Sequence, residues 1–198
     1  MILGITGSFG TGKSTVARMF SRHGFRVIDV DKVYSILTKP HKKIYNEIKK
    51  EFGSGIILKN KNINRNRLKR IVFNDSKKLK KLNAMTHPLI FKEVKKIIKE
   101  IKSKDENADI ALDIPLLIES RFKYPVDKII VVKCSEKIQI KRIKQKKKKY
   151  SDREISQIIK SQMPMKEKIK HADFVVDNSW SLKNTKKQVR RIVVNLKS

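Results

Sequence analysis

The sequence has few of the residues that mark a secreted or membrane protein. Its 198 residues include one cysteine, Cys134, which excludes an internal disulfide and has no spacing partner for a zinc site. No apolar run approaches the length needed to cross a bilayer. The chain reaches Gly7 and Lys13 too soon for a signal peptide. We therefore expect a cytoplasmic protein with no membrane partner.

Acidic residues are also scarce. Lys and Arg number 49 against 19 Asp and Glu, which gives a formal net charge of +30. Such a balance can indicate a nucleic-acid binder, or only the lysine-rich composition that an A+T-biased genome produces. The lysines are spread over nearly every expected helix and no nucleic-acid motif is present, so we favour the second interpretation. Part of the charge can still serve polyphosphate substrates.

The stretch Gly7–Thr15 carries the strongest functional signal. Its letters, GSFGTGKST, fit the P-loop pattern of Gly, four residues and Gly-Lys-Ser/Thr. An apolar segment precedes it, and Val16, Met19 and Phe20 follow at helical spacing. Strand, loop and helix in this order predict a nucleoside triphosphate site.

Each residue type in the motif has a physical task. Glycines allow several backbone N–H groups to point at one phosphate chain, and the helix N-terminus adds its positive dipole end. Lys13 can bridge the β- and γ-phosphates, and the Ser14 hydroxyl can bind Mg²⁺. The residues of the motif expected to bind ATP are Gly7, Gly10, Thr11, Gly12, Lys13, Ser14 and Thr15.

Apolar runs alternate with helical patterns along the chain. This order predicts an α/β fold with a five-stranded, doubly wound parallel sheet and the site at the carboxyl ends of its strands. We expect strands at 1–6, 26–29, 109–113, 128–133 and 174–177. We expect helices around Ile44–Phe52, Leu68–Val72 and Leu79–Leu82, one opening at Pro88, one from Ile140, one capped by Ser151–Glu154, and one closing the chain around Val189–Leu196.

We expect one P-loop domain over residues 1–198. Its core covers about 1–38 and 105–198. An inserted helical lobe covers about 39–104.

Motifs that are missing narrow the class of P-loop protein. A signalling GTPase would carry an Asn/Thr-Lys-x-Asp motif, and this chain has none. A motor ATPase would carry an Asp-Glu pair at the end of its third strand, but Asp113 is followed by Ile114. A compact kinase that acts on a small molecule remains.

Asp31 is the candidate for activating the acceptor. Phosphoryl transfer requires one group that orients and deprotonates the attacking hydroxyl. A carboxylate at the end of the strand beside the P-loop strand can face the γ-phosphate. Alternatively, Asp31 caps a helix that starts near Val33, and spacing alone leaves both roles open.

The chain as a whole resembles the dephospho-coenzyme A kinase family from residue 1 to about residue 180. Single motifs are weak, but their ordered set is specific. The matching segments are Leu3–Gly7 leading into the P-loop, Val27–Asp31, His87–Ile90, Asp113–Glu119, Gln139 with Arg142, Ser161–Pro164 leading to Glu167 and Lys168, Ala172–Asp173 and Val176–Asn178.

The resemblance implies ATP-dependent phosphorylation of the ribose 3′-hydroxyl of dephospho-coenzyme A, with Mg²⁺, as the last step of coenzyme A biosynthesis. It implies that Asp31 is the catalytic base. Asp113 becomes a candidate for holding magnesium through water, with support of the Pro115 turn as the alternative. His87 and Pro88 would lie in the lobe that receives the acceptor, with helix capping or packing as the alternative for His87.

The resemblance implies a single P-loop kinase domain over residues 1–198, in which the helical lobe of about 39–104 is the substrate lobe and a small lid of about 144–153 closes over the phosphates. Gln139, Arg142 and Lys146 are three and four residues apart and share one helix face. The resemblance implies a catalytic lid role for Arg142 and Lys146, whereas a solvated charge run is the preferred interpretation for Lys147–Lys149. Asn178 begins the loop where related kinases hold the adenine of ATP, and could equally be a turn residue.

Two departures from the family pattern affect substrate affinity more than reaction class. The family commonly has an arginine shortly after the Asp31 position, where this chain has Ser35 and no nearby arginine. Lys146 stands where a lid arginine is usual and lacks the bidentate fork of arginine. The rival interpretations are a nucleoside monophosphate kinase and a basic nucleic-acid-binding ATPase. The sequence does not predict the oligomeric state.

Overall fold

The computed structural model describes residues 1–119, 124–146 and 151–197. The chain divides into two compact units. The first comprises 1–29 and 102–198, and the second comprises 30–101. In the part of the chain that the structure describes, no helix combines the length and the apolar character needed to span a membrane.

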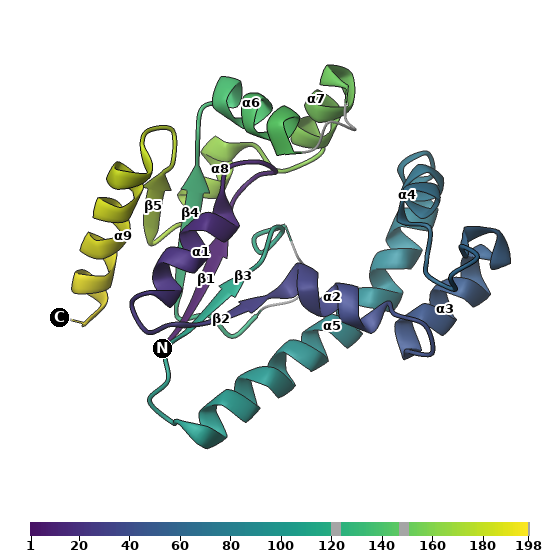
Figure 1. The fold of residues 1–198 in the computed structure, drawn as a ribbon, viewed down its shortest axis with the longest axis horizontal. Coiled ribbons are helices and arrows are strands. Elements are labelled where there is room, and N and C mark those ends of the chain that lie inside the picture. The colour runs from purple at the N-terminus through teal and green to yellow at the C-terminus, as the bar shows by residue number, and fades with distance from the viewer. Residues whose placement is uncertain (120–123, 147–150, 198) are drawn as a thin grey trace. The chain divides into compact units, whose positions relative to one another are not determined.

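The first unit is built on a five-stranded sheet (Figure 1). Its strands lie in the order β2-β3-β1-β4-β5, and every neighbouring pair is parallel. Their bounds are β1 Ile2–Thr6, β2 Arg26–Asp29, β3 Ile110–Asp113, β4 Lys128–Lys133 and β5 Phe174–Asp177. The predicted parallel sheet is therefore confirmed, with β1, which leads into the P-loop, at its centre.

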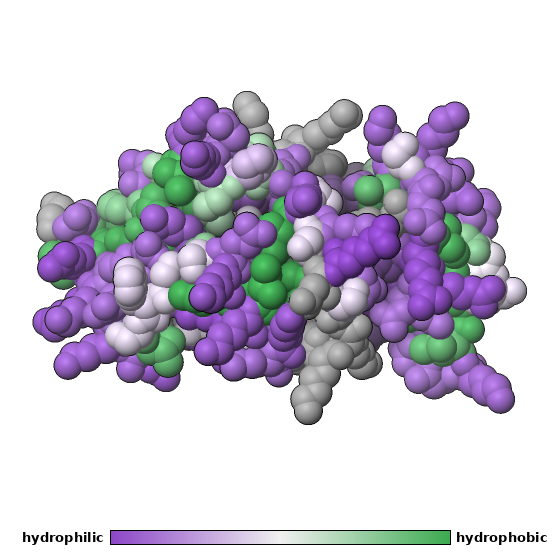
Figure 2. Space-filling view, turned by 90° about the horizontal axis from the view of Figure 1, so that it is seen from above, coloured by the Kyte–Doolittle hydropathy of each residue, from purple (hydrophilic) through white to green (hydrophobic). Residues whose placement is uncertain are grey.

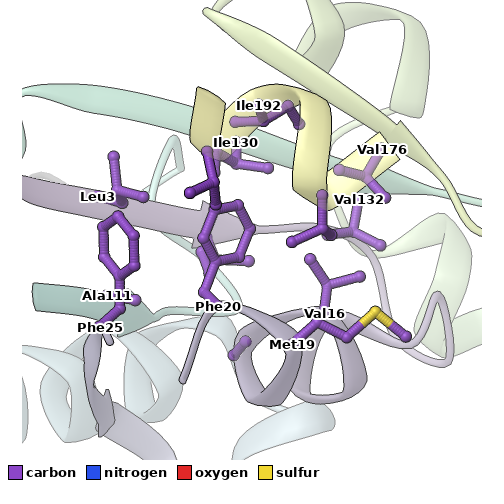
Figure 3. Close-up of a cluster of buried hydrophobic side chains, with 14 residues drawn as sticks. Leu3, Val16, Met19, Phe20, Phe25, Ala111, Ile130, Val132, Val176 and Ile192 are labelled. Carbon is purple, nitrogen blue, oxygen red and sulfur yellow. The ribbon is translucent and has the colours of Figure 1, made fainter. Parts of the chain in front are cut away.

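α1 Lys13–Ser21 and α9 Leu182–Lys197 bury apolar side chains of this sheet. The other helices of the first unit are α6 Glu136–Lys146, α7 Asp152–Lys160 and α8 Met165–Lys170. Figure 3 shows Val16 and Phe20 of α1 and Ile192 of α9 meeting Leu3 and Val132 of the strands, all of them buried. This packing fixes the N-terminus of α1 at the end of β1, because burial of apolar surface holds both elements.

The second unit is helical in its described part. It contains α2 Val30–Leu37, α3 Lys43–Phe52, a 3₁₀ turn η1 Ser54–Ile56, α4 Arg65–Phe73 and most of α5 Ser76–Lys104. The expected helix start at Pro88 is wrong, because Pro88 lies inside the single long helix α5. Leu82, Ile90 and Val94 are buried along one stripe, and this packing outweighs the hydrogen bond that proline cannot donate.

Charged side chains are spread widely over the surface. On the face drawn in Figure 2, hydrophilic residues predominate and are interrupted by smaller apolar areas.

The capping box expected at Ser151 is present, with its hydroxyl accepting from the Glu154 N–H and the Glu154 carboxylate accepting from the Ser151 N–H.

Candidate functional site

The P-loop and three other segments meet at the carboxyl edge of the sheet. The P-loop follows β1, Asp113 ends β3, Cys134 follows β4 and Asn178 follows β5. All these strands are parallel, so their carboxyl ends lie at one edge. The topology therefore places residues far apart in sequence around one loop.

Two glycines of the P-loop have no room for a side chain. Gly12 has φ +90°, and an added Cβ would lie 2.1 Å from Asn178 Nδ2. A Cβ on Gly7 would lie 2.4 Å from the carbonyl oxygen of Val132. The motif therefore needs glycine both for backbone conformation and for close packing against neighbouring strands.

The loop ends in a group of available N–H donors. α1 begins at Lys13, as predicted, and the first helical N–H groups point out of its N-terminus. Within the described residues, the N–H groups of Gly12, Lys13 and Ser14 have no hydrogen-bond acceptor. A cluster of such donors at a helix N-terminus suits a phosphate group.

The Phe9 peptide in the middle of the loop is held from both sides. Its N–H donates to Gln162 Oε1 at 2.8 Å, and its carbonyl oxygen accepts from Gln139 Nε2. Gln139 belongs to α6 and is 4% exposed, whereas Gln162 lies between α7 and α8. The sequence placed Gln139 on the same helix face as Arg142 and Lys146. It gave no reason to connect Gln139 or Gln162 with Phe9.

A buried ion pair supports the segment that carries Gln162. Lys168 of α8 is fully buried and its Nζ lies 2.6 Å from Glu119 Oε1. The same oxygen accepts from the Met163 N–H at 3.3 Å. Burial of an ammonium requires such a partner, so the loop after β3 is fixed to the turn that contacts the P-loop.

Lys13 pairs with Asp113 in this structure. Lys13 Nζ lies 2.6 Å from Asp113 Oδ1, and the side chains are 12% and 3% exposed. Asp113 therefore contacts the P-loop lysine directly, a relationship that the sequence had not predicted. The carboxylate holds the ammonium at the carboxyl edge of the sheet.

Asn178 supports the P-loop through both ends of its amide. Its Nδ2 donates to the Thr11 carbonyl oxygen at 2.8 Å, and its Oδ1 accepts from the Thr185 hydroxyl at 2.9 Å. Asn178 is 2% exposed and Thr185 is fully buried. The Thr11 hydroxyl and N–H both donate to the Ser8 carbonyl oxygen, at 2.9 and 3.2 Å, so both donors are used within the loop and ATP binding by Thr11 stays a prediction. Sequence reasoning missed Thr185.

Arg142 points from α6 toward the P-loop. Its Nη1 is buried, has no hydrogen-bond partner among the described residues, and would lie 3.7 Å from a Cβ built on Gly12. The guanidinium also lies near enough to the Cys134 thiol to affect its pKa. Burial raises the pKa of that thiol more than the nearby Arg142 charge lowers it. Arg142 is thus a cation beside the phosphate-binding loop, whereas the Lys146 side chain and Lys147–Lys149 fall outside the described residues.

The remaining predicted residues lie in the second unit. α2 begins at Val30, so Asp31 lies in its first turn and is not the N-cap of a helix starting near Val33. His87 and Pro88 lie in the interior of α5, which excludes a helix-cap role for His87. Partial burial lowers the pKa of His87. The catalytic role of Asp31 and the binding role of His87 and Pro88 remain predictions.

The oxygen donors near the P-loop fit Mg²⁺ held mainly by phosphate and water. Mg²⁺ prefers hard oxygen ligands and usually takes only one or two from the protein. The exposed Ser14 supplies a hydroxyl, and Asp113 has a second carboxylate oxygen beyond the one that pairs with Lys13. Among the described residues, no group of three His, Cys, Asp or Glu forms a metal site.

Comparisons with known proteins match dephospho-CoA kinases along nearly the whole chain. A family model described as dephospho-CoA kinase matches residues 1–184. The dephospho-CoA kinase of Fusobacterium nucleatum is 41% identical over 192 residues, covering 96% of this chain and 96% of the relative. That of Aquifex aeolicus is 40% identical over 195 residues, covering 98% and 96%. The solved dephospho-CoA kinase from Campylobacter jejuni has a TM-score of 0.68 at 26% identity, covering 98% of this chain and 96% of its own.

Proposed function

The chain belongs to the dephospho-CoA kinase family, and we propose that it transfers the γ-phosphoryl group of ATP to the ribose 3′-hydroxyl of dephospho-coenzyme A. The products are coenzyme A and ADP, so the reaction is the final step of coenzyme A biosynthesis. The observation that carries the proposal is a structured P-loop within a chain that matches this family over residues 1–184. ATP as donor and the single cysteine both suit the cytoplasm.

The P-loop is proposed to bind the triphosphate. The free N–H groups of Gly12, Lys13 and Ser14 supply hydrogen bonds to phosphate oxygens. Lys13 neutralises charge on the β- and γ-phosphates, for which its ammonium moves from Asp113 toward the ligand. Fixed donors aimed at the transferred group lower the barrier because they need no reorganisation during the reaction.

Asp31 is proposed to act as the base for the acceptor. It accepts the proton of the ribose 3′-hydroxyl, and the oxygen then attacks the γ-phosphorus while ADP leaves. Its place in the first turn of α2, two residues after β2 ends, supports this role because helix capping is excluded.

Arg142 and Lys146 are proposed to offset negative charge on the transferring group. The buried Nη1 of Arg142 beside the P-loop supports this role for Arg142. A guanidinium that is already desolvated next to a phosphate site forms a strong charge-assisted hydrogen bond when the anion arrives. For Lys146 the proposal rests on its position at the end of α6.

Ser14 and Asp113 are the residues proposed to hold Mg²⁺, Asp113 through water. The ion would supply charge neutralisation to the phosphates. His87 and Pro88 of α5 are proposed to line the acceptor side. The family match supports a dephospho-coenzyme A kinase over both a nucleoside monophosphate kinase and a nucleic-acid-binding ATPase.

The test is a product assay. Purified protein, ATP, Mg²⁺ and dephospho-coenzyme A should yield coenzyme A and ADP in equal amounts, measured by mass spectrometry. Lys13→Met should remove most of the product, because the neutral side chain keeps its length but not its charge. Lys144→Met is the matched control, since it removes a lysine charge from α6 while leaving the P-loop intact. Absence of product from the unmodified protein would refute the proposal.

A further inference from the structure

The P-loop has little stiffness of its own. Gly7, Gly10 and Gly12 follow one another closely, and the last two adopt φ angles of +85° and +90°. Glycine leaves a chain more conformations than any other residue, so such a loop samples many shapes unless its surroundings fix it. A loop that must become ordered when its ligand binds loses affinity. The contacts that fix this loop beforehand therefore bear on nucleotide binding.

Both backbone polar groups of Phe9 are hydrogen-bonded to side chains from outside the loop. The N–H donates to Gln162 Oε1 at 2.8 Å, and the carbonyl oxygen accepts from Gln139 Nε2. We call these two hydrogen bonds the Phe9 clamp. The backbone decides which end of each amide faces it, because an N–H needs an acceptor and a carbonyl oxygen needs a donor. Phe9 is therefore a support of the loop rather than one of its phosphate donors.

Each glutamine of the clamp is held by the element that carries it. Gln139 is 4% exposed on α6, and its Cγ would lie 3.2 Å from a Cβ built on Gly10, so α6 packs directly against the loop. Gln162 lies in the turn between α7 and α8, which the buried Lys168–Glu119 ion pair fixes to the loop after β3. The clamp thus connects the P-loop to two elements whose own positions are fixed by packing and charge.

We propose that Gln139 and Gln162 are positioning residues, which hold Phe9 from two sides and keep the P-loop in the shape that binds the triphosphate. The inference deepens the proposed function and rests on its assignment of the P-loop to ATP. Donors that are already in place need no reorganisation when the phosphates arrive. Loss of the clamp therefore weakens nucleotide binding and slows transfer, while the affinity for the acceptor is unaffected.

Gln162→Leu tests the clamp, because it removes the acceptor of the Phe9 N–H at a residue that is only partly buried. The dissociation constant of ADP with Mg²⁺, measured by isothermal titration calorimetry, should rise roughly tenfold, as expected when an N–H loses its partner. KM for ATP should rise by a similar factor and kcat should fall, whereas KM for dephospho-coenzyme A should not change. Gln157→Leu, at an exposed glutamine of α7, is the matched control and should alter none of these quantities.

The two glutamines should differ in their tolerance of glutamate. Gln162→Glu keeps an oxygen for the Phe9 N–H and should restore most of the ADP affinity that Gln162→Leu loses. Gln139→Glu places a carboxylate against the Phe9 carbonyl oxygen, where a donor is needed, and should weaken ADP binding at least as much as Gln139→Leu. Equal tolerance of glutamate at both positions would overturn the proposal.

Hydrogen exchange followed by mass spectrometry separates positioning of the loop from general stability. In Gln162→Leu, peptides that cover the P-loop should exchange faster than in the unmodified protein, while peptides from α9 should exchange as before. A lower melting temperature with unchanged P-loop exchange and unchanged ADP affinity would show that Gln162 only stabilises its own turn, and the proposal would be wrong.

The outcomes for the clamp and for the proposed function are distinct, because the ADP titration needs no acceptor. If the unmodified protein makes coenzyme A and Gln162→Leu binds ADP as tightly as it does, the inference alone is wrong. If the unmodified protein makes no coenzyme A but Gln162→Leu weakens ADP binding, the proposed function is wrong and the clamp stands. An equal rise of KM for ATP and for the acceptor would also overturn the inference.

Discussion

The Nζ of Lys13 lies 2.6 Å from Oδ1 of Asp113, which joins the P-loop after β1 to the end of β3. Both side chains are largely buried, so neither charge has water as a ready alternative partner. The pair holds the ammonium of Lys13 at the carboxyl edge of the sheet. Asp113 is therefore placed both to hold Lys13 and to serve the magnesium role proposed for it.

Removal of Asp113 should lower both stability and turnover. Asp113→Ala leaves the Lys13 ammonium without its partner, which should reduce the free energy of unfolding by about 3 kcal/mol. Urea denaturation measures this loss, and kcat should fall as well. Glu100→Gln is the control, because its pair with Lys96 is 3.7 Å long and exposed and should contribute between about 0 and 1 kcal/mol. Equal effects of the two changes would contradict the role given to Asp113.

Asp31→Asn should abolish most turnover while sparing nucleotide binding. The amide cannot accept the proton of the ribose hydroxyl, so kcat should drop by roughly 10²- to 10⁴-fold. ATP binding can be followed by the fluorescence of Trp180, the single tryptophan, which lies two residues after Asn178 and is 69% exposed. Asp29→Asn, at the end of β2, is the neighbouring control. A wild-type kcat in Asp31→Asn would show that Asp31 is not the base.

Asn178→Ala separates two roles for this residue. If Asn178 supports the P-loop through Thr11, KM should rise equally for ATP and GTP, because both share the triphosphate. If it contacts the adenine, only the preference for ATP over GTP should change. We expect the equal rise, with a loss of about 1–3 kcal/mol in unfolding free energy from the unmade hydrogen bonds. Asn184→Ala, an exposed amide on α9, should alter neither quantity.

His87 should make the protein less stable in mild acid. Burial lowers the pKa of His87 in the folded chain, whereas the pKa of the unfolded side chain is about 6.5. Below that pH the unfolded state binds the extra proton, so the free energy of unfolding should fall as pH drops from about 7 to about 5. His87→Gln should flatten this dependence in urea melts, and the exposed control His23→Gln should retain it. The same slope in both variants would contradict the assignment.

The P-loop and the strands could be predicted because their signals are local. Gly12, Lys13 and Ser14 are adjacent in sequence, and each buried strand is a short apolar run. The start of a helix at Pro88 was predicted wrongly, because the buried stripe of α5 carries the helix through the proline. Helix prediction from local sequence accounts for the proline. It does not account for the buried side chains before and after Pro88 that keep α5 continuous.

Contacts between distant residues could not be derived from spacing. Gln162 and Phe9 are 153 residues apart, and Arg65 and Ser35 are thirty residues apart. The short segment of α8 reads as polar, yet Lys168 within it is fully buried because Glu119 supplies its counter-charge. Such relationships depend on how the sheet and helices bring loops together, and no periodicity in the sequence encodes them.

The central claim is transfer from ATP to one particular hydroxyl of one acceptor. The most direct measurement is phosphorus NMR with mass analysis of the product formed from dephospho-coenzyme A, ATP and Mg²⁺, beside parallel reactions with AMP and adenosine. We predict one new phosphomonoester on the ribose 3′-oxygen of dephospho-coenzyme A, with kcat/KM far above that for AMP or adenosine. Phosphorylation of AMP to ADP at a higher kcat/KM, or a phosphate at any other position, would contradict the account.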